Sequence, residues 1–181
     1  MKLVEINFQE YNQVHEFIKD TRPDFVFNMM GPSSVSKFIE NPEEMTSITI
    51  NGFKNLTDSL IETRNFCNFY QASSSEMYGY DSPSPFNELS EFKPNTAYAK
   101  AKHSVHLKSI KYQMEYEWNI VSGIMFNHES PRRGFEFVTR KISSTAAKIK
   151  LGIESELRLG NIEAKRDWGF SGEYVKMMHE M

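Results

Sequence analysis

The sequence predicts an α/β protein built on a doubly wound parallel sheet. Three observations predict this class. Apolar runs of strand length alternate with longer segments of helical period. The runs are apolar at consecutive positions, as in Phe25-Val26-Phe27, which is typical of strands covered by helices on both faces. The chain also contains no internal repeat and no low-complexity stretch.

Composition indicates one globular domain and excludes several classes of protein. The chain has 181 residues, of which 39% are hydrophobic and 25% charged, and its net charge of −3 argues against a nucleic-acid partner. The single cysteine, Cys67, cannot form an intrachain disulfide, which favours a reducing compartment. Glu5 and Asn7 interrupt any leader-like apolar run, and no segment approaches the ~18 apolar residues of a membrane span. We therefore expect a cytoplasmic protein with no membrane partner.

Local signals set the predicted elements in order. Lys2–Ile6 has the composition of a short strand, and Tyr11–Thr21 has apolar residues on one helical face. Asn41-Pro42 is a good pair for the N-cap and first position of a helix over Pro42–Glu62. The remaining predicted strands are Asp24–Met29, Phe66–Ala72, Asn119–Phe126 and Glu156–Leu159, and the remaining predicted helices are Asn95–Tyr116, Phe137–Leu151 and Ser171–His179.

Tyr98 and Lys102 form a Tyr-x-x-x-Lys pattern on a predicted helix. The spacing puts both side chains on one face, within reach of each other. A tyrosine base needs its pKa lowered by ~3 units from ~10, which takes about 4 kcal/mol. A cation ~4 Å away in an effective dielectric of ~20 supplies about that much, so Lys102 could do this alone. The same spacing also occurs often on helices without any function.

A cluster of hydroxyl groups, Ala72-Ser-Ser-Ser-Glu76-Met-Tyr-Gly79, directly follows a predicted strand. Ligands of doubly wound sheets bind beyond the carboxyl ends of strands. Ser74 could hydrogen-bond a sugar oxygen there, and Glu76 could act as a base on a carbon acid. A serine-rich turn that caps the next helix, with Glu76 in its first turn, accounts for the same residues.

A basic cluster lies in the second half of the chain. It comprises Arg132, Arg133, Arg140 and Lys141, in an acidic protein, and forked arginines suit phosphate groups. A solvated surface is the alternative. His128 and Glu129 lack a second ligand pair at a supporting spacing, so no metal site is predicted.

In this order, the motifs resemble the extended short-chain dehydrogenase/reductase family of NAD-dependent epimerases and dehydratases. Ser74 and Glu76, followed by Tyr98-x-x-x-Lys102, match that family's Ser/Thr and Tyr-x-x-x-Lys residues. The match is close over about residues 69–181 and weaker before that. Segments that resemble the GDP-mannose 4,6-dehydratases in particular are Phe69-Tyr-Gln-Ala-Ser, Asn127-His-Glu-Ser-Pro-Arg-Arg-Gly134, Phe137-Val-Thr-Arg-Lys-Ile142 and Leu159-Gly-Asn with Arg166-Asp-Trp-Gly169.

The resemblance implies a Rossmann-like, NAD(P)-binding domain over residues 1–181, with a substrate-binding part that starts at about residue 127. It implies that the cofactor is NADP (or NAD), that the substrate is GDP-mannose and that the protein is a homodimer or homotetramer. The residues that it places in catalysis are Ser74, Glu76, Tyr98 and Lys102. The residues that it places in cofactor binding are Tyr98, Lys102, Asn127, His128, Arg132 and Arg133. The two arginines belong to a loop that lies at a subunit contact in that family. The residues that it places in substrate binding are Asn127, Arg140, Lys141 and Arg166.

The reaction that the resemblance implies is an internal redox dehydration in the metabolism of GDP-mannose towards GDP-fucose. Tyr98 deprotonates the 4-hydroxyl group of GDP-mannose while the C4 hydride passes to NADP⁺. Glu76 removes the C5 proton, the C6 hydroxyl group leaves, and the hydride returns to C6 to give GDP-4-keto-6-deoxymannose. A related nucleotide-sugar dehydratase or epimerase is an alternative.

Departures from the family pattern lead to a second hypothesis. The chain has no Gly-x-x-Gly-x-x-Gly loop to hold the cofactor pyrophosphate, and we expect it to begin at the family's third strand and to lack most of the substrate domain. Met30-Gly31-Pro32 stands where the nicotinamide should lie, and there Met30 would add bulk. A catalytically impaired fragment or a non-catalytic remnant is therefore the alternative, and we expect weak or no activity from these residues alone.

The missing strands should also affect the sheet. In the strand order 3-2-1-4-5-6, Lys2–Ile6 and Asp24–Met29 would be separated by a gap of roughly 14 Å. Either these two strands pair directly, or Lys2–Ile6 is poorly anchored, or another polypeptide fills the gap. An unpaired edge at Phe25–Met29 would be prone to aggregation.

Overall fold

The computed structural model describes residues 2–31, 38, 40–80 and 85–181, which form two compact units, Met1–Met125 and Phe126–Met181. We call them unit 1 and unit 2. No helix in the described residues is long and apolar enough to cross a membrane.

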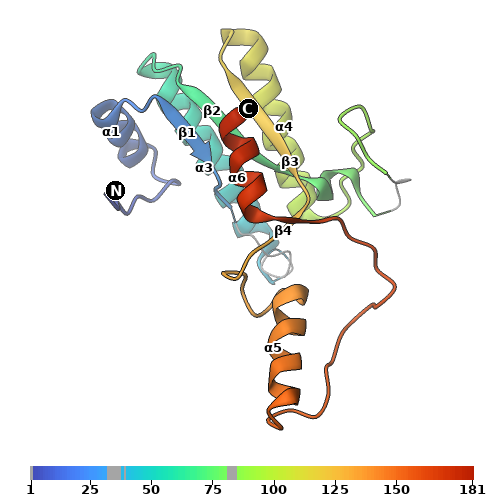
Figure 1. Ribbon diagram of the computed structural model, residues 1–181. Coiled ribbons are helices and arrows are strands. Elements are labelled where there is room, and N and C mark those ends of the chain that lie inside the picture. Colours follow the sequence, from blue (N-terminus) through green and yellow to red (C-terminus); the bar gives the residue numbers. More distant parts are fainter. Residues whose placement is uncertain (1, 32–37, 39, 81–84) are drawn as a thin grey trace. The chain divides into compact units, whose positions relative to one another are not determined.

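Unit 1 is a three-stranded parallel sheet with helical connections (Figure 1). The strand order is β1-β2-β3, with Val26 beside Phe69 and Phe69 beside Ile120. Parallel neighbours need a crossover connection, which α3 and α4 supply, so the predicted parallel α/β class is confirmed. The elements are α1 (Tyr11–Thr21), β1 (Phe25–Asn28), α3 (Pro42–Glu62), β2 (Asn68–Ser74), the 3₁₀ helix η1 (Ser75–Tyr78), α4 (Ala97–Tyr116) and β3 (Ile120–Met125).

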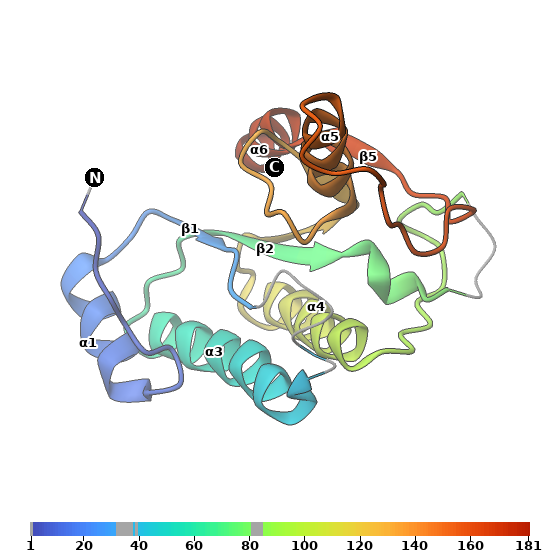
Figure 2. The same cartoon turned by 90° about the horizontal axis from the view of Figure 1, so that it is seen from below.

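The core of unit 1 lies between the sheet and its helices, where α3 and α4 run side by side (Figure 2). The Phe53 and Phe69 rings meet edge to face with centroids 6.1 Å apart, and Trp118 Nε1 donates a hydrogen bond of 2.6 Å to the Cys67 carbonyl oxygen. These contacts join segments that are far apart in the sequence and fix the position of the sheet against both helices. The buried cluster comprises Val14, Ile18, Phe53, Leu56, Leu60, Cys67, Phe69, Val105, Trp118 and Ile120.

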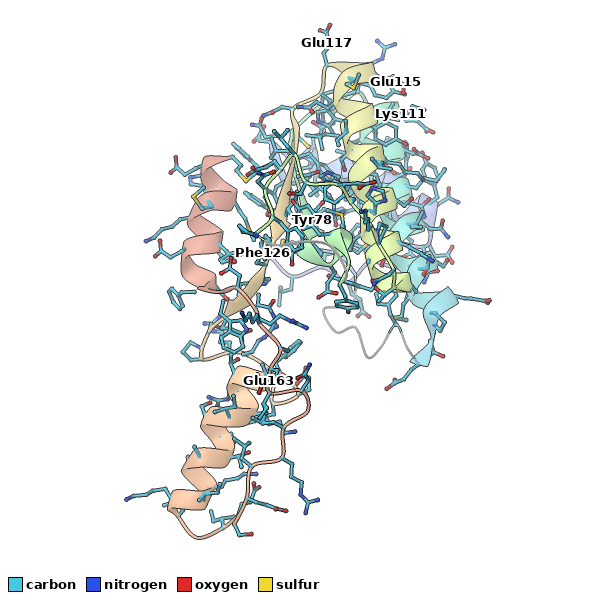
Figure 3. The ribbon with its side chains drawn as sticks, turned by 90° about the vertical axis from the view of Figure 1, so that its right-hand side faces the viewer. Tyr78, Lys111, Glu115, Glu117, Phe126 and Glu163 are labelled. Carbon is cyan, nitrogen blue, oxygen red and sulfur yellow. The ribbon has the colours of Figure 1, made fainter. Side chains whose placement is uncertain are left out.

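The helices of unit 1 follow their local signals closely. The bounds of α1 and α3 are those predicted, and Pro42 is the first residue of α3. Helix α4 ends beyond the exposed Lys111–Glu115 ion pair of 3.8 Å, where Glu117 adopts a left-handed φ of 51° (Figure 3). Such a reversal stops the helix because its next amide no longer points back along the axis.

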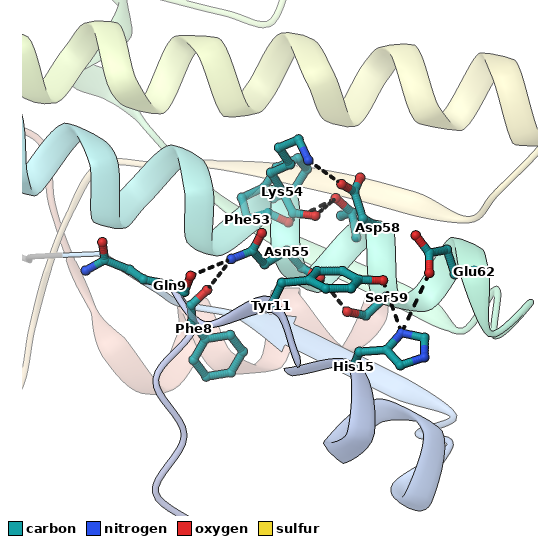
Figure 4. Close-up of polar contacts among 11 residues, drawn as sticks. Phe8, Gln9, Tyr11, His15, Phe53, Lys54, Asn55, Asp58, Ser59 and Glu62 are labelled. Atoms are coloured by element: carbon teal, nitrogen blue, oxygen red, sulfur yellow. Dashed lines mark hydrogen bonds and ion pairs between the residues drawn. The ribbon is translucent and has the colours of Figure 1, made fainter. Parts of the chain in front are cut away.

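The prediction of a strand at Lys2–Ile6 is wrong. These residues have no regular secondary structure, and β1 pairs with β2 alone among the described residues. The chain is anchored just after this segment, where Asn55 Nδ2 of α3 donates to the carbonyl oxygens of Phe8 at 2.9 Å and Gln9 at 3.1 Å (Figure 4). Among the described residues no strand pairs with Lys2–Ile6, so its backbone lacks the hydrogen-bonding neighbour that a strand needs.

Among the described residues β1 pairs with β2 alone, so its other edge is unpaired, as expected. Phe25 and Phe27 are 59% and 46% exposed, whereas Asn28 is buried. Consecutive strand residues point to opposite faces, so the two phenylalanines share the face away from the helices.

Unit 2 contains a two-stranded parallel sheet and two helices. Strand β4 (Asn127–Glu129) pairs with β5 (Trp168–Phe170), α5 spans Val138–Lys150 and α6 spans Ser171–Glu180. The predicted strand at Glu156–Leu159 is wrong. There Arg158 Nε donates to Glu156 Oε1 at 2.7 Å within an irregular segment, and the partner of β4 comes from Trp168–Phe170 instead.

We predict that Asn55→Ala releases the amino-terminal segment from α3. Loss of these two hydrogen bonds, one partly buried and one exposed, should cost ~1–2 kcal/mol locally and speed amide exchange in residues 2–10, measured by hydrogen–deuterium exchange mass spectrometry. Asn51→Ala is the matched control, because the Asn51 side chain bonds Ser47 within the same helix, at 2.9 Å, and no other residue in the described part of the chain. Equal exchange in both variants would show that Asn55 does not hold the segment.

Candidate active site

The candidate active site of unit 1 lies where β2 ends and α4 begins. Ser74 is the last residue of β2, is buried, and accepts a hydrogen bond of 3.3 Å from the Glu76 backbone amide. This contact caps η1, so the capping role considered for the serine cluster is confirmed for Ser74. Glu76 lies in the first turn of η1 and is partly exposed. The strand end therefore carries a hydroxyl group and a carboxylate side by side.

Tyr98 enters the same region because of the way α4 starts. Thr96 caps the helix through a 3.1 Å hydrogen bond from the Ala99 amide to its hydroxyl oxygen, which puts Tyr98 in the first turn. The Ser74 hydroxyl group lies close enough to the phenol to lower its pKa, and Glu76 lies close enough for its charge to raise it. The ring of Phe38 packs edge to face on Tyr98, with centroids 5.1 Å apart. Sequence reasoning thus correctly grouped Ser74, Glu76 and Tyr98.

Lys102 lies one turn beyond Tyr98 and is only 6% exposed. Its Nζ donates to the carbonyl oxygens of Ala72 at 3.1 Å and Met30 at 3.4 Å. Burial lowers the pKa of Lys102 from 10.5 to about 8. The ammonium group therefore joins the ends of β1 and β2 to α4 at an electrostatic cost.

The expectation that Lys102 alone lowers the pKa of Tyr98 is wrong for this structure. Burial raises the pKa of Tyr98 above 10, the nearby Ser74 hydroxyl group lowers it in part, and the charge of Glu76 raises it again. The argument from sequence counted the attraction of a cation but not the desolvation of the phenolate, which only tertiary packing determines.

Met30 and Gly31 follow β1 beside Lys102. The sulfur atom of Met30 packs against Gly52 of α3, so its side chain points into the core and does not add bulk at the site as expected. Gly31 has a φ of +110°, which favours glycine, and a Cβ there would lie 3.9 Å from Lys102 Nζ. Thr49 Oγ1 would lie 3.2 Å from the same Cβ, so the Thr49 side chain and the amine both border Gly31. Pro32 lies outside the described residues.

The basic cluster of unit 2 proves to be heterogeneous. Arg133 is partly buried, with its Nε 3.1 Å from Glu129 Oε2 and its guanidinium carbon 3.4 Å from the centroid of the Phe137 ring. Its neighbour Arg132 is exposed. Adjacent arginines therefore differ: Arg133 is engaged within the chain, whereas Arg132 faces solvent.

The other residues singled out in unit 2 lie on or near its small sheet. Asn127 and His128 belong to β4, and His128 Nδ1 lies 2.9 Å from the Phe126 carbonyl oxygen. Arg140 stacks over Phe135 at 4.9 Å, whereas Lys141 and Arg166 are exposed.

A hollow of about 410 Å³ in unit 2 includes Arg140 in its wall. Thr139 and Ser143 also line this hollow, and the Thr139 hydroxyl group donates a hydrogen bond of 2.5 Å to Glu129 Oε2. Sequence reasoning missed these two hydroxyl residues, although their i, i+4 spacing on a helix beside Arg140 was a usable signal. The lining residues are Glu129, Ser130, Pro131, Thr139, Arg140, Ser143, Gly169 and Phe170.

We predict that Lys102→Met changes how stability depends on pH. Between pH 8 and 10.5 the unfolded chain keeps the Lys102 proton that the native chain loses, so the wild-type free energy of unfolding rises with pH in this window. Between pH 7 and pH 10 the free energy of unfolding of the wild type should increase by about 2 kcal/mol relative to that of the variant, measured by urea denaturation. Lys100→Met, at an exposed position, is the control, and its free energy of unfolding should differ from that of wild type by the same amount at every pH. A constant difference for Lys102→Met would contradict its buried charge.

Comparisons with known proteins agree with the resemblance seen in the sequence. A sequence model of the family described as GDP-mannose 4,6 dehydratase matches residues 1–181. GDP-mannose 4,6 dehydratase 2 of Arabidopsis thaliana is 37% identical over 182 residues, which cover 98% of this chain and 48% of the plant protein. The GDP-mannose 4,6-dehydratase of Yersinia enterocolitica is 39% identical over 168 residues, covering 91% of this chain and 45% of that protein.

Solved structures share the fold at lower identity. The structure of RMD from Pseudomonas aeruginosa, complexed with NADPH, has a TM-score of 0.89 at 21% identity and covers 97% of this chain and 62% of that one. A UDP-N-acetylglucosamine 4-epimerase from Methanobrevibacter ruminantium has a TM-score of 0.81 at 24% identity, covering 96% and 55%. The chain spans about half the length of the curated relatives that it matches. Because the family model matches this chain from residue 1 to residue 181, the chain belongs to the GDP-mannose 4,6-dehydratase family.

Proposed function

We propose that the site at the end of β2 is the active site of a GDP-mannose 4,6-dehydratase, a hydro-lyase that forms GDP-4-keto-6-deoxymannose. One observation carries the proposal: the Tyr98 phenol lies close enough to the Ser74 hydroxyl group and the Glu76 carboxylate for both to shift its pKa, with Lys102 one turn away. The identity of the chain to dehydratases of plants and bacteria supports this choice of reaction.

The residues fit one end of a nicotinamide dinucleotide. Lys102 Nζ has two carbonyl acceptors among the described residues, which leaves a third N–H for a ligand hydroxyl group. We assign Tyr98 and Lys102 to the nicotinamide end of NADP, with NAD as the alternative. The NADPH and NAD complexes among the structural neighbours support a nicotinamide cofactor. Such a cofactor, when bound, supplies a hydride acceptor for C4 and a hydride donor for C6.

Each residue of the site then has a chemical task. Tyr98 holds and removes the proton of the sugar 4-hydroxyl group, and Ser74 hydrogen-bonds the same oxygen. Because the pKa of Tyr98 is raised in the free chain, this step needs a positive charge that a bound ligand brings beside the phenol. Glu76, partly exposed at the strand end, removes the C5 proton that a 4-keto group makes acidic, after which water leaves from C6.

Unit 2 is proposed to hold the nucleotide sugar. Asn127, Arg140, Lys141 and Arg166 are the proposed contacts, and the hollow beside Arg140 offers hydroxyl and guanidinium donors suited to phosphate. His128 and the exposed Arg132 remain proposed cofactor contacts, and the homo-oligomer remains the proposed assembly. Arg133 is a weaker candidate, since its Nε already forms an ion pair with Glu129 and its guanidinium carbon lies over the Phe137 ring.

A second candidate function is that of a catalytically impaired or non-catalytic family member. The observation that favours it is the lack of a Gly-x-x-Gly-x-x-Gly loop among the 181 residues, which removes a main source of dinucleotide affinity in this fold. We therefore expect turnover by this chain to be slow. A related nucleotide-sugar epimerase would invert C4 without losing water, so the mass of the product separates the two activities.

We predict that the chain, incubated with GDP-mannose and NADP⁺, forms a product lighter by the mass of one water, seen by mass spectrometry. Tyr98→Phe should lower this rate at least ~100-fold, because the proton acceptor is lost. Tyr116→Phe, at the far end of the same helix, should leave the rate unchanged. No product from wild type would favour the non-catalytic alternative.

We predict that Glu76→Gln blocks the exchange of the substrate C5 proton. In D₂O the wild-type product should carry deuterium at C5, and Glu76→Gln should reduce its formation by ~100-fold or more, measured by NMR. Glu91→Gln is the control, since Glu91 pairs with Lys93 on an exposed loop at 3.1 Å. Unchanged deuterium incorporation in Glu76→Gln would assign the C5 base to another residue.

A further inference from the structure

His106 is a buried titratable residue that the proposed chemistry does not use. It lies one turn beyond Lys102 on α4 and is 7% exposed. Its Nδ1 is 3.0 Å from the hydroxyl oxygen of Ser73, which is 3% exposed and directly precedes Ser74. A buried pair of this kind is held in place, because loss of either partner leaves the other unsatisfied.

Three consecutive residues of β2 thus lie against three side chains of α4. Lys102 Nζ donates to the Ala72 carbonyl oxygen, His106 bonds the Ser73 hydroxyl group, and Ser74 lies close enough to Tyr98 to lower its pKa. The three helix residues are spaced four apart, so they follow one face of α4 along the strand end. His106 is the member of this set to which the proposed chemistry gives no task, although it bonds the serine directly before Ser74.

His106 also contacts the loop that follows η1. The Phe92 ring meets His106 edge to face at 5.3 Å and stacks on Tyr78 at 5.0 Å. Tyr78, labelled in Figure 3, is two residues beyond Glu76 and donates a hydrogen bond of 2.8 Å to the Asn87 carbonyl oxygen. One imidazole therefore touches both the strand end that carries Ser74 and the aromatic stack beside Glu76.

The imidazole is held in its neutral form by its surroundings. Burial and the charge of His103 on the same helix lower the pKa of His106. The groups packed against it from other elements, Ser73 of β2 and Phe92 of the loop, carry no charge. A neutral ring can keep its bond with Ser73 throughout the neutral pH range.

We propose that His106 is a positioning residue: by holding Ser73 and Phe92 together it fixes the end of β2 and the η1 turn against α4, and so sets the geometry of Ser74, Glu76, Tyr98 and Lys102. The purpose of that geometry rests on the proposed function. The positioning itself is a structural claim and is tested without substrate or cofactor.

The test measures the pKa of Lys102 by NMR of the chain labelled with ¹³C at the lysine side chains, with Lys102→Met to assign the signal. In His106→Phe, which keeps a ring against Phe92 but loses the bond to Ser73, β2 should loosen from α4 and admit water to Nζ. The pKa of Lys102 should then rise from about 8 by about 1 unit towards its ordinary value. His106→Asn, whose amide can replace Nδ1, should restore the wild-type value.

His103→Phe is the matched control. His103 contacts the same Phe92 ring at 5.3 Å, on the same helix, but Ser73 is bonded by His106. This variant should leave the pKa of Lys102 unchanged. Ser73→Ala removes the bond from the strand side with a smaller change of shape and should give the same rise as His106→Phe, so the test stands even if His106→Phe fails to fold. An unchanged pKa of Lys102 in the folded Ser73→Ala variant would overturn the proposal, whether or not the chain turns over GDP-mannose.

Discussion

The buried ammonium group of Lys102 is the constraint on which the candidate site depends. It bonds the carbonyl oxygens of Met30 and Ala72, which lie at the ends of two neighbouring strands, and so ties both to α4. Taking a charge out of water is costly, and the pKa of Lys102 falls to about 8 as a result. That cost is compensated by the rest of the fold, because the large apolar core behind α3 and α4 keeps the helix and the sheet together.

Burial shifts the pKa values of Tyr98 and Lys102 in opposite directions. It raises the pKa of Tyr98 above 10 and lowers that of Lys102 to about 8, so at neutral pH the phenol is neutral while the amine still carries its proton. A ligand that brings polar or charged groups between these side chains would change the balance, which couples binding to the start of the proposed proton transfer.

Much of the fold and of the site could be predicted because the signals were local. The Asn41-Pro42 pair and the apolar period set the bounds of α3 and α1, and an i, i+4 spacing brought Tyr98 and Lys102 to one face of a helix. The order of strand, serine cluster and helix also placed Ser74 and Glu76 correctly near Tyr98. What could not be predicted depended on partners distant in the sequence. Lys2–Ile6 has a strand's composition but pairs with no strand of the described residues, and the chain after it is held by Asn55, which bonds the Phe8 carbonyl oxygen 47 positions earlier in the sequence.

The sequence by itself determined the α/β class, most helix bounds and the residue types that can carry acid–base chemistry, since each of these follows from composition and short-range periodicity. Only the tertiary structure decided that Trp168–Phe170 pairs with β4, that Arg133 is engaged by Glu129 while Arg132 is exposed, and that the pKa of Tyr98 rises. The reason is the same in each case. Strand pairing, ion pairing and desolvation are set by which groups surround a residue in space, and a linear pattern does not contain that information.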